Sequence, residues 1–140
     1  MKLVELNTYV PKLRWAVGSN RSHARGYGKT LQDDPEYTLI WVNIRDAFQH
    51  GFRHAVLDPD DPTGGENSIG DRVARAKQHW ADGGYMNPSV CSMNGHGSFD
   101  WGDGRHRMVA AAQMGEVYSP VLFPVEDLPG LEQTGIKTLR

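Results

Sequence analysis

The chain has 140 residues, of which 39% are hydrophobic, and its 15 basic and 17 acidic side chains give a formal net charge of −2. This length allows one domain with a real core but not two, and the charge predicts no overall attraction to nucleic acid. The one cysteine, Cys91, excludes a disulfide framework and a thiolate metal site. No apolar run approaches the roughly 20 residues of a membrane span, and the N-terminus lacks the apolar stretch of a signal peptide. We therefore expect a single cytoplasmic domain, residues 1–140, with no membrane partner.

The first predicted element is a strand over residues 2–10, which ends at Pro11. Residues 11–36 are polar and rich in Gly, Ser, Asn and Arg, which predicts a loop. The basic part of this loop, residues 11–32, contains no acidic residue and carries Lys12, Arg14, Arg21, Arg25 and Lys29. Basic residues interspersed with aromatic ones could follow a nucleic-acid backbone, with charge on phosphate and ring on base. The simpler interpretation is a solvated loop with a few rings folded onto the core.

Residues 37–43, YTLIWVN, form the most strand-like run of the chain. They are β-branched, aromatic and apolar nearly throughout, which is typical of a strand covered on both faces. A short helix is predicted over residues 44–52, with Ile44, Phe48 and Phe52 on one face.

Two segments resemble metal sites only superficially. His50 and His54 could share a metal ion on a helix, but Gly51 and the lack of a third ligand argue against this. The acidic residues of the loop at 57–66 do not continue into a calcium-loop pattern, so they are expected to be solvated. No metal site is predicted.

A second helix is predicted to begin at a capping box in residues 68–71 and to end at Gly83 and Gly84. Its buried stripe, at helical spacing, is Ile69, Val73, Ala76 and Trp80. Arg72 and Arg75 lie off this stripe. A surface role is their simpler interpretation, although either could reach a phosphate bound at Arg105.

Two strands, residues 89–93 and 98–101, are predicted to form a hairpin, and a third strand covers residues 117–125. Between them lies WGDGRHRMVAAAQMG, residues 101–115, which predicts a short helix that lies close on a sheet through Met108, Ala111 and Ala112. Residues 126–140 show little periodicity and predict a short helical turn and a tail. The fold class is therefore α/β (α+β), a small mixed sheet with packed helices.

The helix that follows Gly104 is predicted to form an anion site. The first turn of a helix has N–H groups without an intrahelical partner and a partial positive charge, so it holds phosphate well. Gly102 and Gly104 would permit a positive φ or a close approach of the ligand. Arg105 and Arg107 are the strongest candidates for phosphate contact, because guanidinium groups match phosphate oxygens in pairs. They leave the helix on different sides, so we expect at most one to lie flat over the anion, while the other contacts a second phosphate or an internal carboxylate.

Asp103 and His106 are the candidate catalytic residues. As an N-cap, the Asp103 carboxylate would accept the N–H groups of Arg105 and His106, which are the donors a phosphate would use. If the loop binds phosphate, Asp103 must turn outward, where it could bind Mg²⁺ or orient a water molecule. His106 could be a general acid or base near neutral pH, or a hydrogen-bonded side chain that fastens the helix to the sheet.

The order of elements around this motif resembles the ParB/sulfiredoxin-like superfamily. The resemblance covers residues 69–124: a helix, a Gly-Gly turn followed by Asn87 and Pro88, a hairpin, the box Gly104-Arg105-His106-Arg107 with its alanine helix, and a Pro-Val strand. In ParB proteins the box reads Gly-Glu-Arg-Arg and touches nucleotide phosphates, whereas in sulfiredoxins it reads Gly-Cys-His-Arg and the cysteine does the chemistry. Arg105 stands at the cysteine position here, which argues against sulfinic-acid repair and leaves phosphate binding intact.

The resemblance implies a ParB/sulfiredoxin-like fold and a protein that binds a nucleoside triphosphate, ATP or CTP, with or without Mg²⁺. Stand-alone relatives in the superfamily hydrolyse nucleoside triphosphates or cleave DNA, so we expect one of these activities, in the DNA metabolism of a phage, plasmid or other mobile element. The residues named for phosphate contact are Gly102, Gly104, Arg105, His106, Arg107 and Arg72.

Two other functions stay open. The chain could be a non-catalytic accessory protein that binds DNA or a host protein through the basic segment 11–32. It could also transfer phosphate to a small metabolite as a kinase does, with Asp100 or Asp103 as the base. The sequence contains no Gly-x-x-x-x-Gly-Lys-Ser/Thr, His-Glu-x-x-His or Gly-x-Ser-x-Gly motif, which removes several commoner enzyme classes.

Overall fold

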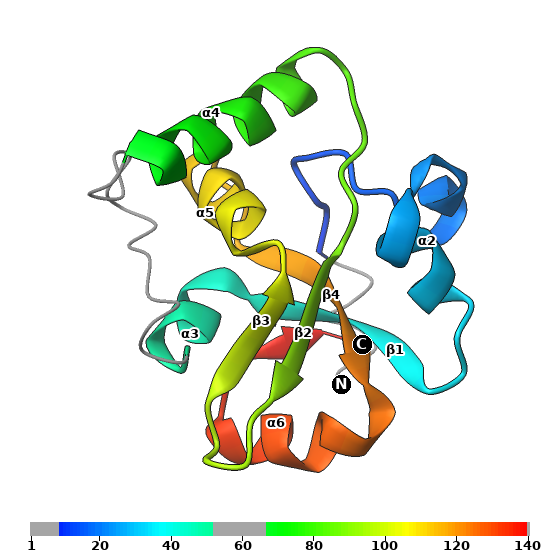
Figure 1. Ribbon diagram of the computed structural model, residues 1–140, viewed down its shortest axis with the longest axis vertical. Coiled ribbons are helices and arrows are strands. Elements are labelled where there is room, and N and C mark those ends of the chain that lie inside the picture. The colour runs from blue at the N-terminus through cyan, green and yellow to red at the C-terminus, as the bar shows by residue number, and fades with distance from the viewer. Residues whose placement is uncertain (1–8, 52–66, 140) are drawn as a thin grey trace.

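The computed structural model describes residues 9–51 and 67–139, and of residues 67–70 the backbone alone. Within these residues the chain forms an α/β domain with a five-stranded mixed sheet in the order β3-β2-β4-β1-β5 (Figure 1). The strands are β1 (Tyr37–Asn43), β2 (Ser89–Met93), β3 (Phe99–Asp103), β4 (Tyr118–Pro124) and β5 (Thr138–Leu139). The helices are η1 (Gly18–His23), α2 (Gly26–Gln32), α3 (Ile44–Gln49), α4 (Asn67–Ala81), α5 (Arg105–Gln113), η3 (Val125–Asp127) and α6 (Leu128–Thr134), of which η1 and η3 are 3-10 helices. The predicted class, a small mixed sheet with packed helices, is confirmed.

β1 and β4 run antiparallel along their whole length, with Tyr37 opposite Pro124 at one end and Asn43 opposite Tyr118 at the other. The five central residues of β4 are all buried. A strand that is buried at consecutive positions is covered on both faces. The predicted strand over residues 37–43 has the bounds expected from the sequence.

α5 connects the hairpin to the centre of the sheet. β2 pairs antiparallel with β3 and parallel with β4, where Ser89 lies opposite Val121. Parallel pairing requires a crossover, and the chain makes it by leaving β3, passing through α5 and returning as β4. Asp103 pairs with Val90 and Trp101 with Cys91, so Gly102 is the extra residue of a β-bulge at the end of β3. α5 therefore starts directly after a bulge.

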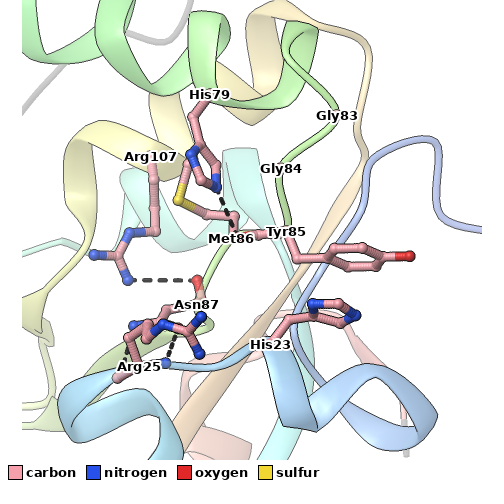
Figure 2. Close-up of a pocket in the computed structure, with 9 residues that line it drawn as sticks. All are labelled: His23, Arg25, His79, Gly83, Gly84, Tyr85, Met86, Asn87 and Arg107. Atoms are coloured by element: carbon pink, nitrogen blue, oxygen red, sulfur yellow. Dashed lines mark hydrogen bonds between the residues drawn. The ribbon is translucent and has the colours of Figure 1, made fainter.

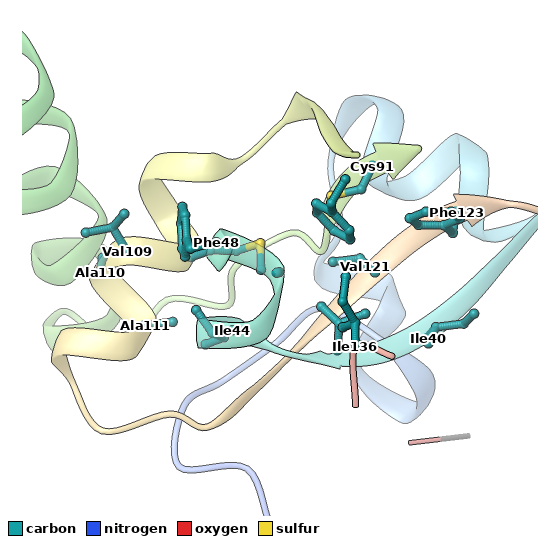
Figure 3. Close-up of a cluster of buried hydrophobic side chains, with 14 of the residues drawn as sticks. Ile40, Ile44, Phe48, Cys91, Val109, Ala110, Ala111, Val121, Phe123 and Ile136 are labelled. Atoms are coloured by element: carbon teal, nitrogen blue, oxygen red, sulfur yellow. The ribbon is translucent and has the colours of Figure 1, made fainter. Parts of the chain in front are cut away.

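The hydrophobic core lies between the sheet and the helices that pack on it (Figure 3). The ring centroids of Phe99 and Phe123 are 5.8 Å apart, and Trp101 stacks on Phe48 at 4.9 Å. The buried residues of α5 are Met108, Val109, Ala110 and Ala111. Cys91 is also buried, and this burial raises the pKa of its thiol. Cys91 therefore fills core volume, as a small apolar side chain would.

The predicted loop over residues 11–36 is wrong, because this segment contains η1 and α2. Tertiary hydrogen bonds hold it in place. Asn87 accepts a hydrogen bond from the Arg25 amide at 2.9 Å and donates one to the Arg25 carbonyl at 2.8 Å. The Gln32 amide nitrogen donates to the carbonyls of Ala16 and Gly28, each at 2.9 Å. The segment is therefore attached to the rest of the domain, although most of its polar side chains are exposed.

The predicted C-terminal tail is also wrong. After α6 the chain forms β5, which pairs with β1 at Leu139 opposite Trp41. Ile136 and Leu139 are buried. The amide of Asn43 donates to the Lys137 carbonyl at 2.8 Å and extends this contact. A strand of two residues is too short to show a periodic pattern, so the sequence alone does not reveal it.

Several predictions fall outside the described residues. The predicted first strand at 2–10 lies mostly outside them, and so do Phe52, His54 and the acidic loop at 57–66. The side chains of residues 68–70 in the predicted capping box are also not described. Of the described helices, none is long and apolar enough to cross a membrane.

A buried carboxylate joins the N-terminal segment to the turn between α5 and β4. Glu116 is 4% exposed and accepts hydrogen bonds from the amides of Lys12 at 3.1 Å and Leu13 at 3.0 Å, from the Trp15 indole at 3.1 Å, and from the Tyr9 hydroxyl. Burial and the bond to Glu116 raise the pKa of the Tyr9 hydroxyl well above its ordinary value. Four protein donors thus replace the water molecules that would otherwise bond to this carboxylate.

Candidate functional site

The first turn of α5 is shaped by Gly104. This residue is the N-cap with a φ of 97°, and a Cβ atom there would lie 2.4 Å from the Ser89 hydroxyl oxygen. That hydroxyl donates a hydrogen bond to the Gly104 carbonyl at 3.1 Å. The position therefore excludes other residues both by its backbone conformation and by its close approach to β2.

Asp103 does not cap the helix. No side chain makes a cap hydrogen bond at Gly104, and the Asp103 carboxylate lies instead 3.4 Å from the Arg107 guanidinium. The Asp103 side chain is 59% exposed. Of the two orientations left open by the sequence, the structure has the outward one, so the Asp103 carboxylate does not sit on the amides of the first turn.

Arg107 is held by the backbone of the segment that leads into β2. Its guanidinium donates to the carbonyls of Pro88 at 3.1 Å and Asn87 at 3.4 Å, as well as to Asp103. The side chain is 19% exposed. These three contacts fix the plane of the guanidinium and leave some of its five N–H donors for a ligand. Figure 2 shows Arg107 facing the segment at Asn87, opposite Arg25.

α4 and α5 enclose a pocket of about 330 Å³, which we call the helix pocket. Its lining residues are Arg72, Arg75, Ala76, His79, Met86, Asp103, Gly104, His106 and Arg107. Three arginines and two histidines thus face a single aspartate. Within the described part of the chain Arg72 and Arg75 form no ion pair. Among the described residues, the positive charge of this pocket is therefore only partly compensated.

His106 lies in this positive field. Burial lowers its pKa below the ordinary value of 6.5, and the neighbouring Arg105 and Arg72 lower it further. The imidazole is therefore neutral at pH 7 and has one nitrogen able to accept a proton. A bound anion would oppose the arginines and favour the protonated form.

A second pocket, of about 440 Å³, continues from the first past His79, Met86 and Arg107, which line both. We call it the corner pocket, because its other wall is the corner between η1 and α2 (Figure 2). Its lining residues are His23, Arg25, His79, Gly83, Gly84, Tyr85, Met86, Asn87 and Arg107. The ring of His23 stacks on Tyr85 with a centroid distance of 4.0 Å and an interplanar angle of 6°.

The structure brings together many of the residues that the sequence singled out. Arg72, Asp103, Gly104, His106 and Arg107 all line the helix pocket. Gly102 lies in the bulge of β3 and outside the lining. Arg105 also lies outside the lining but close enough to affect the pKa of His106.

The basic segment does not form one surface. Arg25 lines the corner pocket, whereas Arg21 forms an ion pair with Asp33. Lys12 lies against Gly115, beyond the C-terminal end of α5. Arg14 and Lys29 are exposed and line neither pocket. A continuous nucleic-acid track through all five basic residues is therefore not favoured.

His79, His23 and Tyr85 were not recognised from the sequence as site residues. For Arg75 a surface role was the simpler interpretation, with contact to a phosphate at Arg105 as the alternative. A helical pattern could have revealed part of this set, because Arg72, Arg75 and His79 are spaced i, i+3 and i+7 and share one face of α4. No sequence pattern joins His23 to Tyr85, because the folding of η1 and α2 onto the segment after α4 creates that contact.

No group of three or more His, Cys, Asp or Glu side chains in the described residues could hold a metal ion. Asp103 is the one carboxylate that the described residues contribute to the helix pocket. A single carboxylate suits Mg²⁺ that arrives with phosphate oxygens, which supply the remaining ligands together with water. Asp103 is therefore the residue that would contact a magnesium ion brought by a nucleotide.

In comparisons with known proteins, no family model, curated protein or solved structure matched the chain. The resemblance to the ParB/sulfiredoxin-like superfamily therefore rests on residues 69–124 of the chain itself.

Proposed function

We propose that this chain is a ParB/sulfiredoxin-like nucleotide-binding protein that holds the phosphates of ATP or CTP in the helix pocket. The observation that carries the proposal is the convergence of Arg72, Arg75 and Arg107 on the first turn of α5, where Asp103 is the one acidic residue among the described residues of the lining. Cations gathered in this way repel one another, and an anion with several oxygens relieves the repulsion.

The first turn of α5 adds backbone donors to these side chains. Gly104 has no Cβ atom to obstruct a ligand, and neither Gly104 nor Asp103 caps the helix with a side chain. Phosphate oxygens can therefore accept hydrogen bonds from the amides of Arg105 and His106 while guanidinium groups lie beside them. Arg107, held by the carbonyls of Asn87 and Pro88, would present its remaining N–H donors.

Hydrolysis of the bound triphosphate is the reaction that this arrangement would support. A water molecule attacks the terminal phosphorus, the bond to the bridging oxygen breaks, and a diphosphate and phosphate result. Neutral His106 would accept the proton of the attacking water, and Asp103 would contact Mg²⁺. The kinase-like alternative uses the same pocket with a metabolite hydroxyl in place of water, whereas the accessory-protein alternative needs neither His106 nor Asp103.

A thermal-unfolding screen tests the proposal. We expect ATP or CTP, with or without Mg²⁺, to raise the unfolding temperature, because a ligand that binds only the folded state stabilises it in proportion to occupancy. Arg72→Gln should remove most of this rise without changing the unfolding temperature of the free protein, because Arg72 is exposed and unpaired in the described residues. Lys137→Gln, which removes an exposed charge far from the pocket, is the matched control. A rise that is equal in the Arg72→Gln variant would refute the proposed site.

A further inference from the structure

The corner pocket has chemistry of its own beyond the helix pocket. Its lining includes two arginines, Arg25 and Arg107, and two histidines, His23 and His79, and no acidic residue from residues 9–51 or 67–139. Its volume of about 440 Å³ falls within the range of ordinary small-molecule sites. A pocket with this lining favours an anionic group over a neutral one.

One wall of the same pocket contains two aromatic rings stacked face to face, each with one outer face left for a ligand. The His23 and Tyr85 rings are stacked 6° from parallel, and both residues line the cavity. An aromatic ligand could extend this stack, and bases stack on such platforms with little dependence on sequence. The wall and the cations together match a nucleotide unit, which has both a base and a phosphate.

The corner is also held in one shape before any ligand binds. The Asn87 side chain bonds both the amide and the carbonyl of Arg25. Gly28 of α2 approaches Asn87 so closely that a Cβ atom would lie 2.8 Å from its side-chain carbon. On the other side, the His79 ring donates to the Tyr85 carbonyl at 2.7 Å. A site that is already ordered loses little conformational entropy when a ligand binds.

We infer that, beyond a nucleoside triphosphate in the helix pocket alone, the two pockets together bind a phosphodiester-linked strand of at least two nucleotides. Its terminal phosphate lies in the helix pocket, and the adjoining nucleotide lies in the corner pocket with its base on the His23–Tyr85 stack and its phosphate beside Arg25. This inference rests on the proposed function, because it takes the helix pocket as the phosphate site. A mononucleotide whose phosphates lie beside α5 would bring only its neutral base and sugar to the corner pocket. Arg25 and His23 would then have no anion to bind, whereas a second nucleotide supplies one.

Isothermal titration calorimetry with four probes tests the inference: inorganic triphosphate, thymidine monophosphate, and dithymidylate phosphorylated at the 5′ or at the 3′ end. We expect one of the two dinucleotides to bind at least about tenfold more tightly than thymidine monophosphate, which is the gain typical of one stacked base. His23→Ala and Arg25→Gln should each weaken the dinucleotide at least about fivefold and leave the affinity for inorganic triphosphate unchanged. Lys29→Gln removes the same charge from an exposed position of α2 outside the pocket, so it is the matched control for Arg25→Gln.

The outcomes separate the two proposals. If inorganic triphosphate, ATP and CTP all fail to bind, the proposed function is wrong and the inference fails with it. A second outcome would overturn the inference alone. In it, inorganic triphosphate binds, the Arg72→Gln variant binds it more weakly, and neither dinucleotide binds more tightly than thymidine monophosphate. The inference alone is also overturned if the His23→Ala and Arg25→Gln variants bind the dinucleotide with the affinity of the native chain. Thermal unfolding must first show that both variants are folded.

Discussion

At the scale of single residues, the site depends on Gly104. Its φ of 97° lies in the left-handed region, and the space a Cβ atom would need is occupied by Ser89, the first residue of β2. The sequence predicted a backbone role for this glycine, but only the structure identifies Ser89 as the neighbour that occupies the space a side chain would need. The contact fixes where α5 begins and therefore where its amides point.

Gly104→Ala is expected to lower the free energy of unfolding by about 1–3 kcal/mol, because it combines an unfavourable φ with a contact that forces Ser89 to move. Gly95→Ala is the matched control, since no atom lies within 4 Å of the Cβ it would add and its φ is not positive. Urea unfolding of both variants measures the difference. An equal effect in the two variants would show that the Gly104 contact is not important for stability.

His106 is expected to titrate below its ordinary pKa of 6.5, because it is partly buried and faces Arg105 and Arg72. Between this lowered pKa and 6.5 the unfolded chain binds more protons than the folded one, so stability is lost as the pH falls below about 6.5. Nuclear magnetic resonance titration of the ring measures the pKa. Addition of inorganic triphosphate should raise it, and a pKa that does not respond to this anion would contradict the proximity of His106 to the phosphate site. The His106→Asn variant should lack this component of the pH dependence.

At the scale of elements, the strands are the part of the fold that the sequence predicts best. Residues 37–43 and 89–93 form strands with the expected bounds, and the strands at 99–103 and 118–124 differ from expectation by a few residues at their ends. β1 and β4 have largely apolar sequences because neighbouring strands and helices bury much of their surface. η1, α2 and β5 were missed, since their formation depends on contacts with Asn87 and with β1 rather than on a local pattern.

Part of the site could be predicted in the same way. The residues around Gly104 were found because a glycine, basic residues and a helix start occur together in the sequence. The contribution of α4 was only half recognised, although the spacing of Arg72, Arg75 and His79 places them on one face. The corner pocket could not be predicted, because it forms only when η1 and α2 fold against the segment after α4 (Figure 1).

Glu116→Gln is expected to lower the free energy of unfolding by about 3 kcal/mol. Four buried donors bond to the two carboxylate oxygens of Glu116, whereas an amide side chain has only one acceptor oxygen. The change affects the attachment of the N-terminal segment, so hydrogen exchange at the amides of Lys12 and Leu13 should rise more than exchange in β4. Glu126→Gln, at an exposed position, serves as the control. If the free energy of unfolding changes equally in the two variants, the buried carboxylate does not hold the segment.

At the scale of the whole molecule, the charge is unevenly distributed. The net charge of −2 gives no sign of an anion-binding protein, yet four arginines and three histidines line the two connected pockets against one aspartate. The topology causes this segregation. The crossover through α5 brings the first turn of that helix beneath α4, and the chain from α4 to β2 then passes η1 and α2 (Figure 1). Residues from three distant parts of the sequence meet there, which composition cannot reveal.

The most direct measurement is a titration of the isotope-labelled protein with inorganic triphosphate, followed by amide chemical shifts. The account predicts that the amides of Arg105, His106 and Arg107, together with the guanidinium signal of Arg107, shift most and saturate with one binding constant, and that Arg72→Gln weakens this binding. If these signals stay unchanged, or if the largest shifts occur on another surface of the molecule, the phosphate site at the first turn of α5 is contradicted.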